Sequence, residues 1–168
     1  MKISLKLTGD LLRRVEDDLS RHHPFAAERV GFMTAHAAHL SGGGILLLAF
    51  DYVSLPDDVY VQDDSIGARV HADGFRIARQ RAYTDSTAII HVHEHDHRGT
   101  PAFSSTDTIE TRRFMPDFLH VRPTMPHAAV ILSHDSMVGR CWVKGKQQPV
   151  PIQQFTIVGP GVRKISYV

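Results

Sequence analysis

The sequence has little cysteine, no long apolar run and no excess of one charge. Cys141 is the single cysteine of 168 residues, so an internal disulfide is excluded. No stretch approaches the roughly 18 consecutive apolar residues of a membrane-spanning helix, and the start lacks the apolar core of a secretory signal. Lys and Arg number 19 against 18 Asp and Glu. We therefore expect a cytoplasmic protein whose main partner is neither membrane nor nucleic acid.

The composition fits one compact domain that spans residues 1–168. Hydrophobic residues make up 42% of the chain and charged residues 22%, which is enough apolar material for a real core. No internal repeat or linker is visible. The glycine run Gly42–Gly44 lacks the Lys and the Ser or Thr that follow in a phosphate-binding loop, so it indicates a turn.

The order of periodic segments predicts the fold class. Alternation and β-branched runs predict strands, and helical spacing predicts helices. The expected strands are 2–7, 28–39, 44–53, 87–93, 128–133 and 137–144, and 153–166 should add one or two edge strands. The expected helices are 11–21, 68–82 and 108–114. Pro24 should end the first, and the third should be capped by 104–107 and closed by Pro116. Asp63 and Asp64 should mark a turn. Antiparallel hairpins at 28–53 and 128–144 then give an α/β fold with a mixed, largely antiparallel sheet flanked by helices.

Histidine is abundant, with twelve in the chain and four at alternate positions from His91 to His97. Alternate residues of a strand share one face, so two histidines at i and i+2 can reach one metal ion. A catalytic zinc typically takes three protein ligands, and Asp107, at the predicted start of a helix, is the candidate for the third. Taken alone, the tract could also be an adventitious metal binder.

The spacing around this tract resembles that of the JAMM (MPN-type) zinc metalloproteases. The family signature is H-x-H, about seven residues, then S-x-x-D, and here His93-Glu94-His95 is followed after eight residues by Ser104-Ser105-Thr106-Asp107. The segment from Glu28 to Gly31 is similar to the E-x-x-G that opens the first hairpin of the family. Residues 129–133 and 139–142 look like the two strands after the metal helix. The resemblance covers roughly residues 24–144 and implies an MPN/JAB-like, cytidine-deaminase-like sandwich.

Three departures from the family pattern affect the choice of histidines. Asp96 stands where the family usually has proline, the spacer is one residue longer, and His91 and His97 are additional. A pair formed by residues 91 and 93 would leave ten residues before Ser104, and a pair formed by 95 and 97 would leave six. His93 and His95 fit best, with His91 behind the site and His97 in a loop at its rim.

The resemblance implies a chemistry for each matched residue. His93, His95 and Asp107 would hold Zn²⁺, Glu28 would act as general base, and Ser104 would donate a hydrogen bond to the oxyanion. The implied reaction is hydrolysis of a peptide or isopeptide bond after the extended C-terminal tail of a ubiquitin-like protein, by a compact bacterial type of enzyme. The tail would add to a sheet edge beside the metal. An activating enzyme of the same pathway is a further expected partner.

Other interpretations stay open at this point. A metallo-β-lactamase motif, H-x-H-x-D-H, is a near miss because the tract has histidine where that motif requires aspartate. The chain could instead be a His-rich metal-binding or metal-sensing module, or a metal-free MPN-type scaffold, without hydrolase activity. Individually, Glu28 could be an exposed strand carboxylate and Ser104 a simple helix cap.

Overall fold

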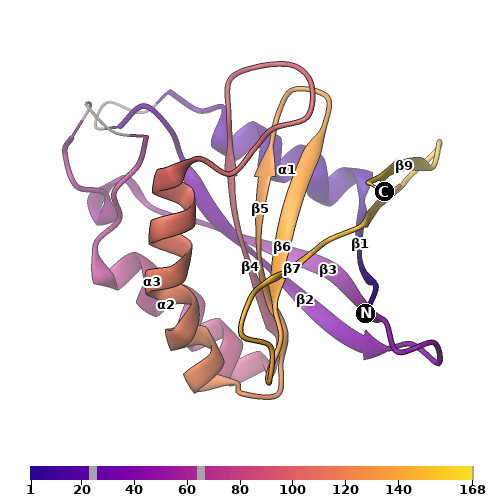
Figure 1. Ribbon diagram of the computed structural model, residues 1–168. Coiled ribbons are helices and arrows are strands. Elements are labelled where there is room, and N and C mark those ends of the chain that lie inside the picture. The colour runs from indigo at the N-terminus through magenta and orange to yellow at the C-terminus, as the bar shows by residue number, and fades with distance from the viewer. Residues whose placement is uncertain (23–25, 64–66, 168) are drawn as a thin grey trace.

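The computed structural model describes residues 1–22, 26–63 and 67–167. Within these ranges the chain forms one nine-stranded sheet, three α-helices and a short 3-10 helix (Figure 1). The strands are β1 (Ile3–Thr8), β2 (Val30–His39), β3 (Ile45–Ser54), β4 (Ala88–Glu94), β5 (His127–Leu132), β6 (Met137–Trp142), β7 (Val150–Pro151), β8 (Gln154–Val158) and β9 (Arg163–Ser166). The helices are α1 (Gly9–Leu19), η1 (Asp57–Val59), α2 (Ala72–Asp85) and α3 (Ser105–Val121). None of these helices is long and apolar enough to cross a membrane.

The sheet is mixed, and antiparallel pairs outnumber parallel ones. Its strand order is β7-β6-β5-β4-β2-β3-β1-β8-β9. The pairs β1–β3, β1–β8 and β4–β5 are parallel, whereas β2–β3, β2–β4, β5–β6, β6–β7 and β8–β9 are antiparallel. The predicted α/β class with a mixed, largely antiparallel sheet is confirmed, and so are both predicted hairpins.

Helices cover both faces of this sheet (Figure 1). On one face, α1 buries Leu11, Leu12 and Val15 against the inward side chains of β1 and β3. On the other face, α2 and α3 share a core that includes Phe32 of β2 and Phe118 of α3. The strand β4 lies between β2 and β5, in the middle of the sheet, so its two faces are both buried.

The prediction that Pro116 closes its helix is wrong. The helix α3 begins at Ser105, continues through Pro116 and ends at Val121. A proline inside a helix loses one backbone hydrogen bond and costs about 3 kcal/mol. Continuation buries Phe118 one turn after Phe114, and each fully buried side chain of this size contributes about 1.5–3 kcal/mol. Pro116 itself is exposed, so its ring meets solvent on the outer face.

Two further expectations concern segment ends. Residues 153–166 form β8 and β9, and β9 is an edge strand as predicted, whereas β8 lies between β1 and β9. The first helix ends at Leu19, and Pro24, expected to end it, lies outside the described residues, as does Asp64 of a predicted turn.

The sheet order also rules out strand addition directly beside the histidines. Both sides of β4 are already paired, with His93 opposite Val30 of β2 and Ile131 of β5. The outermost strands of the sheet are β7 and β9. An extended peptide therefore cannot hydrogen-bond to the backbone of β4 as a neighbouring strand.

Candidate metal centre

Two histidines meet at the C-terminal end of β4. His93 is the last buried residue of the strand on the face covered by α3, and His95 follows directly after the strand ends at Glu94. Their Nε2 atoms are 3.2 Å apart. Two imidazole nitrogens this close share one proton or one cation, because two donor N–H groups cannot face each other at hydrogen-bond distance.

Asp107 approaches both histidines from the first turn of α3. Its Oδ1 lies 3.2 Å from Nε2 of His93, and its Oδ2 lies 3.6 Å from Nε2 of His95. The carboxylate is held by a capping box, in which Ser104 N–H donates to Oδ2 at 2.7 Å and Asp107 N–H donates to Oγ of Ser104 at 3.1 Å. The helix start therefore fixes the position of this carboxylate independently of the histidines.

The charge state of Asp107 follows from these contacts. Burial alone would raise the pKa of this carboxyl, but the hydrogen bond and charge of His93, together with the hydrogen bonds from Ser104, outweigh it. The pKa of Asp107 is consequently held well below its usual range. These contacts therefore favour the ionised carboxylate, which is the form that binds a metal ion.

Glu28 brings a second carboxylate to the same histidines from just before β2. Its carboxylate oxygen and one ring nitrogen from each of His93 and His95 all lie within 4.8 Å of one another. The backbone of Glu28 is anchored by its N–H, which donates to the carbonyl of Gly67 at 2.7 Å. A Cβ on Gly67 would come within 2.7 Å of Oε2 of Glu28, so the absence of a side chain there leaves room for the carboxylate.

The spacing of these atoms fits a tetrahedral metal ion. Ligand atoms about 2.0–2.1 Å from a tetrahedral zinc lie roughly 3.3 Å from one another. Nε2 of His93 lies 3.2 Å from Nε2 of His95 and 3.2 Å from Oδ1 of Asp107, and the other oxygen of this carboxylate, Oδ2, lies 3.6 Å from Nε2 of His95. Two imidazole nitrogens and a carboxylate oxygen are also a donor set that zinc accepts. The residues present could therefore hold such an ion, with Glu28 close enough to serve as a further ligand or as a base.

The remaining residues predicted for the site lie around this cluster. Ser104 is exposed at the start of α3, where its Oγ accepts the N–H of Asp107, so its O–H is free to donate. His97 lies in the exposed loop after β4, with its ring centroid 6.1 Å from that of His95. The structure thus brings Glu28, His93, His95 and Asp107 together and places Ser104 beside the last of them.

His91 lies deeper on the same face of β4 and does not join the cluster. Its ring packs against Phe32 and Phe114, with centroid separations of 5.6 and 5.0 Å. Burial, reinforced by the neighbouring His93, lowers the pKa of His91 to about 3, so its imidazole is neutral. Its Nδ1 is buried and has no hydrogen-bond partner among the described residues.

Gly67 is the residue that the sequence analysis missed. It follows a stretch with no motif, and only its proximity to Glu28 gives it a role. Asp63 and Asp64 predict a turn near Gly67, but a turn signal does not indicate that this glycine lies against Glu28, 39 residues earlier in the chain.

Comparisons with known proteins assign no family to the chain. No family model matches the sequence, and no curated protein matches it. A solved structure described as a Trichoplax adhaerens STIL N-terminal domain aligns with 82% of this chain at 11% identity and a TM-score of 0.40. This chain spans 40% of the length of that structure. A similarity of this size carries no conclusion about fold or function.

Proposed function

We propose that the protein is a zinc-dependent hydrolase of amide bonds, a peptidase or isopeptidase with the MPN/JAB-like arrangement of the JAMM family. Within that class, the resemblance of its motifs favours cleavage after the C-terminal tail of a ubiquitin-like protein. The observation that carries the proposal is the second carboxylate. His93, His95 and Asp107 suffice as ligands for a catalytic zinc, and Glu28 is then left beside them as a base.

The chain's own residues account for the proton movements of such a reaction. When bound, zinc would supply Lewis-acid chemistry and lower the pKa of a coordinated water toward about 7. Glu28 would accept a proton from the attacking water and deliver it to the leaving amine. Ser104 would donate its free O–H to the developing oxyanion, since its Oγ already accepts the N–H of Asp107.

The decisive experiment substitutes the base and keeps the metal. Glu28→Gln is nearly isosteric and removes only the ability to accept a proton. We expect one equivalent of zinc to be retained while kcat for a ubiquitin-like protein with a C-terminal extension falls by about 10²–10⁴-fold. Hydrolysis that persists in this variant, or in native protein treated with a chelator, would contradict the proposal.

A second function is favoured by the position of Glu28 itself. Because Glu28, His93 and His95 form a compact donor set of their own, Glu28 could be a ligand in a metal-binding module without hydrolase activity. Glu28→Gln would then weaken zinc binding, and Asp107→Asn would leave it largely intact. Metal analysis of these two variants distinguishes the two functions directly.

A further inference from the structure

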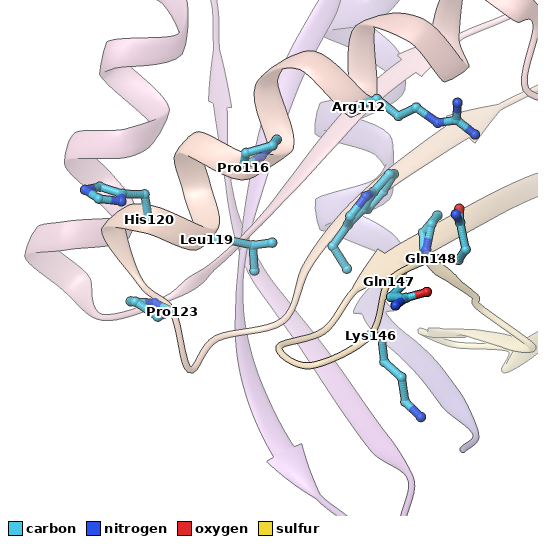
Figure 2. A pocket seen from close by; sticks show the side chains of 10 residues that line it. Arg112, Pro116, Leu119, His120, Pro123, Lys146, Gln147 and Gln148 are labelled. Carbon is cyan, nitrogen blue, oxygen red and sulfur yellow. The ribbon is translucent and has the colours of Figure 1, made fainter.

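A groove that is lined by none of the candidate metal ligands runs along α3. Two adjoining hollows, of about 750 and 270 Å³, share Arg112, Trp142, Gln148 and Pro149. One wall is α3, and the other is formed by β6 and the loop that follows it (Figure 2). We refer to the two hollows together as the α3–β6 groove.

One end of the groove is next to the candidate metal centre. The smaller hollow begins at Thr108, the residue after Asp107, where Oγ1 of Thr108 accepts a hydrogen bond from Arg140 at 3.3 Å. The larger hollow extends along α3 to His120. Twelve residues of helix rise about 18 Å, which is the length of five or six extended peptide residues at about 3.3 Å each.

The charges of the α3–β6 groove are all of one sign. Arg112, Arg140 and Lys146 line it, and no Asp or Glu is among the described residues that do so. Arg112 and Lys146 make no ion pair within the described part of the chain. Arg140 lies over the ring of Phe103, 4.2 Å from its centroid, with its guanidinium otherwise bound only to Thr108 among these residues. Such a surface is complementary to carboxylates.

The floor of the groove favours a peptide over a nucleic acid. Pro116 and Leu119 of α3 (Figure 2) and Trp142 of β6 are apolar and line the larger hollow. Gln147 and Gln148 add amide groups that can bond a peptide backbone. A nucleic-acid site normally needs a broad basic surface, whereas this chain has a formal charge of only +1.

We infer that the α3–β6 groove binds an extended acidic segment of a protein and leads it toward the candidate metal centre. That this protein is the substrate rests on the proposed function, whereas the binding itself does not. The complementary ligand carries Asp or Glu at positions that meet Arg112 and Lys146, with apolar residues between them that contact Trp142.

Direct binding to the full chain, in the presence of a chelator, tests this inference without any turnover. The probe is a labelled acidic hexapeptide, compared with a counterpart in which Asn and Gln replace Asp and Glu. Trp142 is the only tryptophan of the chain, so its fluorescence reports occupancy of the groove, and anisotropy of the label gives an independent measure. We expect the acidic peptide to change Trp142 fluorescence and to bind at least about tenfold more tightly than the neutral one.

Two charge-reversal variants locate the binding site. Arg112→Glu/Lys146→Glu should weaken binding of the acidic peptide by at least about tenfold. The matched control Lys6→Glu/Lys164→Glu changes the net charge equally at exposed positions of β1 and β9 and should change binding by less than about twofold. All four side chains are exposed, and a melting curve of each variant verifies folding. If the reversal variant does not fold, Arg112→Gln/Lys146→Gln replaces it.

Three results would overturn the inference. These are equal binding of the neutral and acidic peptides, equal weakening in both charge-reversal variants, and binding of a single-stranded oligonucleotide of the same charge at least as tightly as the peptide. Native protein without hydrolase activity would still show the predicted binding. The inference and the proposed function can therefore fail separately.

Discussion

His91 and His93 lie two residues apart on one face of β4, but their surroundings differ. His91 is enclosed by Phe32 and Phe114, and Nδ1 of each of the two histidines is buried without a partner among the described residues. Nε2 of His93 faces the carboxylate of Asp107 and the ring of His95. Burial in an apolar environment disfavours the charged imidazole, whereas a carboxylate favours a bound proton or cation.

The difference shows that the side chains around each histidine, and not its place in the alternating pattern, decide whether it can take part in a metal site. Both side chains are buried and both belong to the same alternating tract. Only His93 is at the strand end, where the first turn of α3 and the residues before β2 bring Asp107 and Glu28 close. His91, only two residues before His93, therefore lies outside the group of residues that could hold a metal ion.

The largest expected effect is on zinc content. The native protein should bind one equivalent, and His93→Ala and Asp107→Ala should each lose it, because with Glu28 acting as base only two ligands remain, and two ligands do not hold zinc tightly. His91→Leu should retain it, since His91 is outside the cluster. Metal analysis after dialysis provides the measurement. Zinc that is lost in His91→Leu but retained in His95→Ala would show that His91 and His93 are the pair that binds the metal.

The next effect concerns the positioning of Glu28. In Gly67→Ala the new methyl group would lie 2.7 Å from Oε2 of Glu28 and push the carboxylate away. The displaced group is the end of a flexible side chain, so the melting temperature should hardly change. We expect zinc to be retained and kcat to fall by about 10- to 100-fold, as for a misplaced base. Unchanged turnover in a folded variant would remove the role of Gly67.

A smaller effect, on stability, is expected from His127 at the start of β5. Its Nδ1 accepts the N–H of Ile89 at 3.0 Å, and burial lowers its pKa from 6.5 to about 4. The unfolded state therefore takes up a proton first as the pH falls. Stability from this residue is complete above pH 6.5 and is lost between about pH 6.5 and 4, at about 1.4 kcal/mol per pH unit.

His127→Asn tests this dependence on pH. Asparagine keeps an oxygen that can accept the N–H of Ile89 but does not titrate. Urea unfolding in the presence of a chelator, from pH 7 to pH 4, should show a slope shallower than that of the native protein by about 1.4 kcal/mol per pH unit. An identical slope in the two proteins would mean that His127 is not the titrating group.

The smallest effect comes from replacing each of two buried histidines, His91 and His127, by leucine. His91→Leu removes a buried nitrogen that has no partner and should raise the free energy of unfolding by about 1 kcal/mol. His127→Leu also removes a nitrogen without a partner among the described residues, Nε2, but it leaves the N–H of Ile89 without its acceptor and should lower the free energy of unfolding by about 1–3 kcal/mol. Denaturant unfolding at pH 7 measures both. Changes of the same sign would contradict this account of the two sites.

Local patterns in the sequence predicted most helices and strands, because the spacing of apolar residues follows the period of the backbone. The apolar run before the histidines gave β4, and the Ser104 to Asp107 spacing gave the capped start of α3. Pro116 misled the prediction because its local cost is offset by a contribution of similar size from the burial of Phe118, a contact with distant strands. Alternation did not decide whether segment 153–166 supplies one or two edge strands, because strand order is not encoded in alternation, and the structure places only β9 at an edge.

The sequence by itself determined the histidine tract, its alternation on one strand face and the helix cap that orients Asp107, since all three depend on neighbours within a few residues. Only the tertiary structure decided that β4 is central, that Glu28 reaches the histidines past Gly67, and that His91 is enclosed by aromatic rings. These features depend on packing between segments about 30 to 80 residues apart in the chain. The spacing of residues within one helix or strand does not indicate which distant segments pack together.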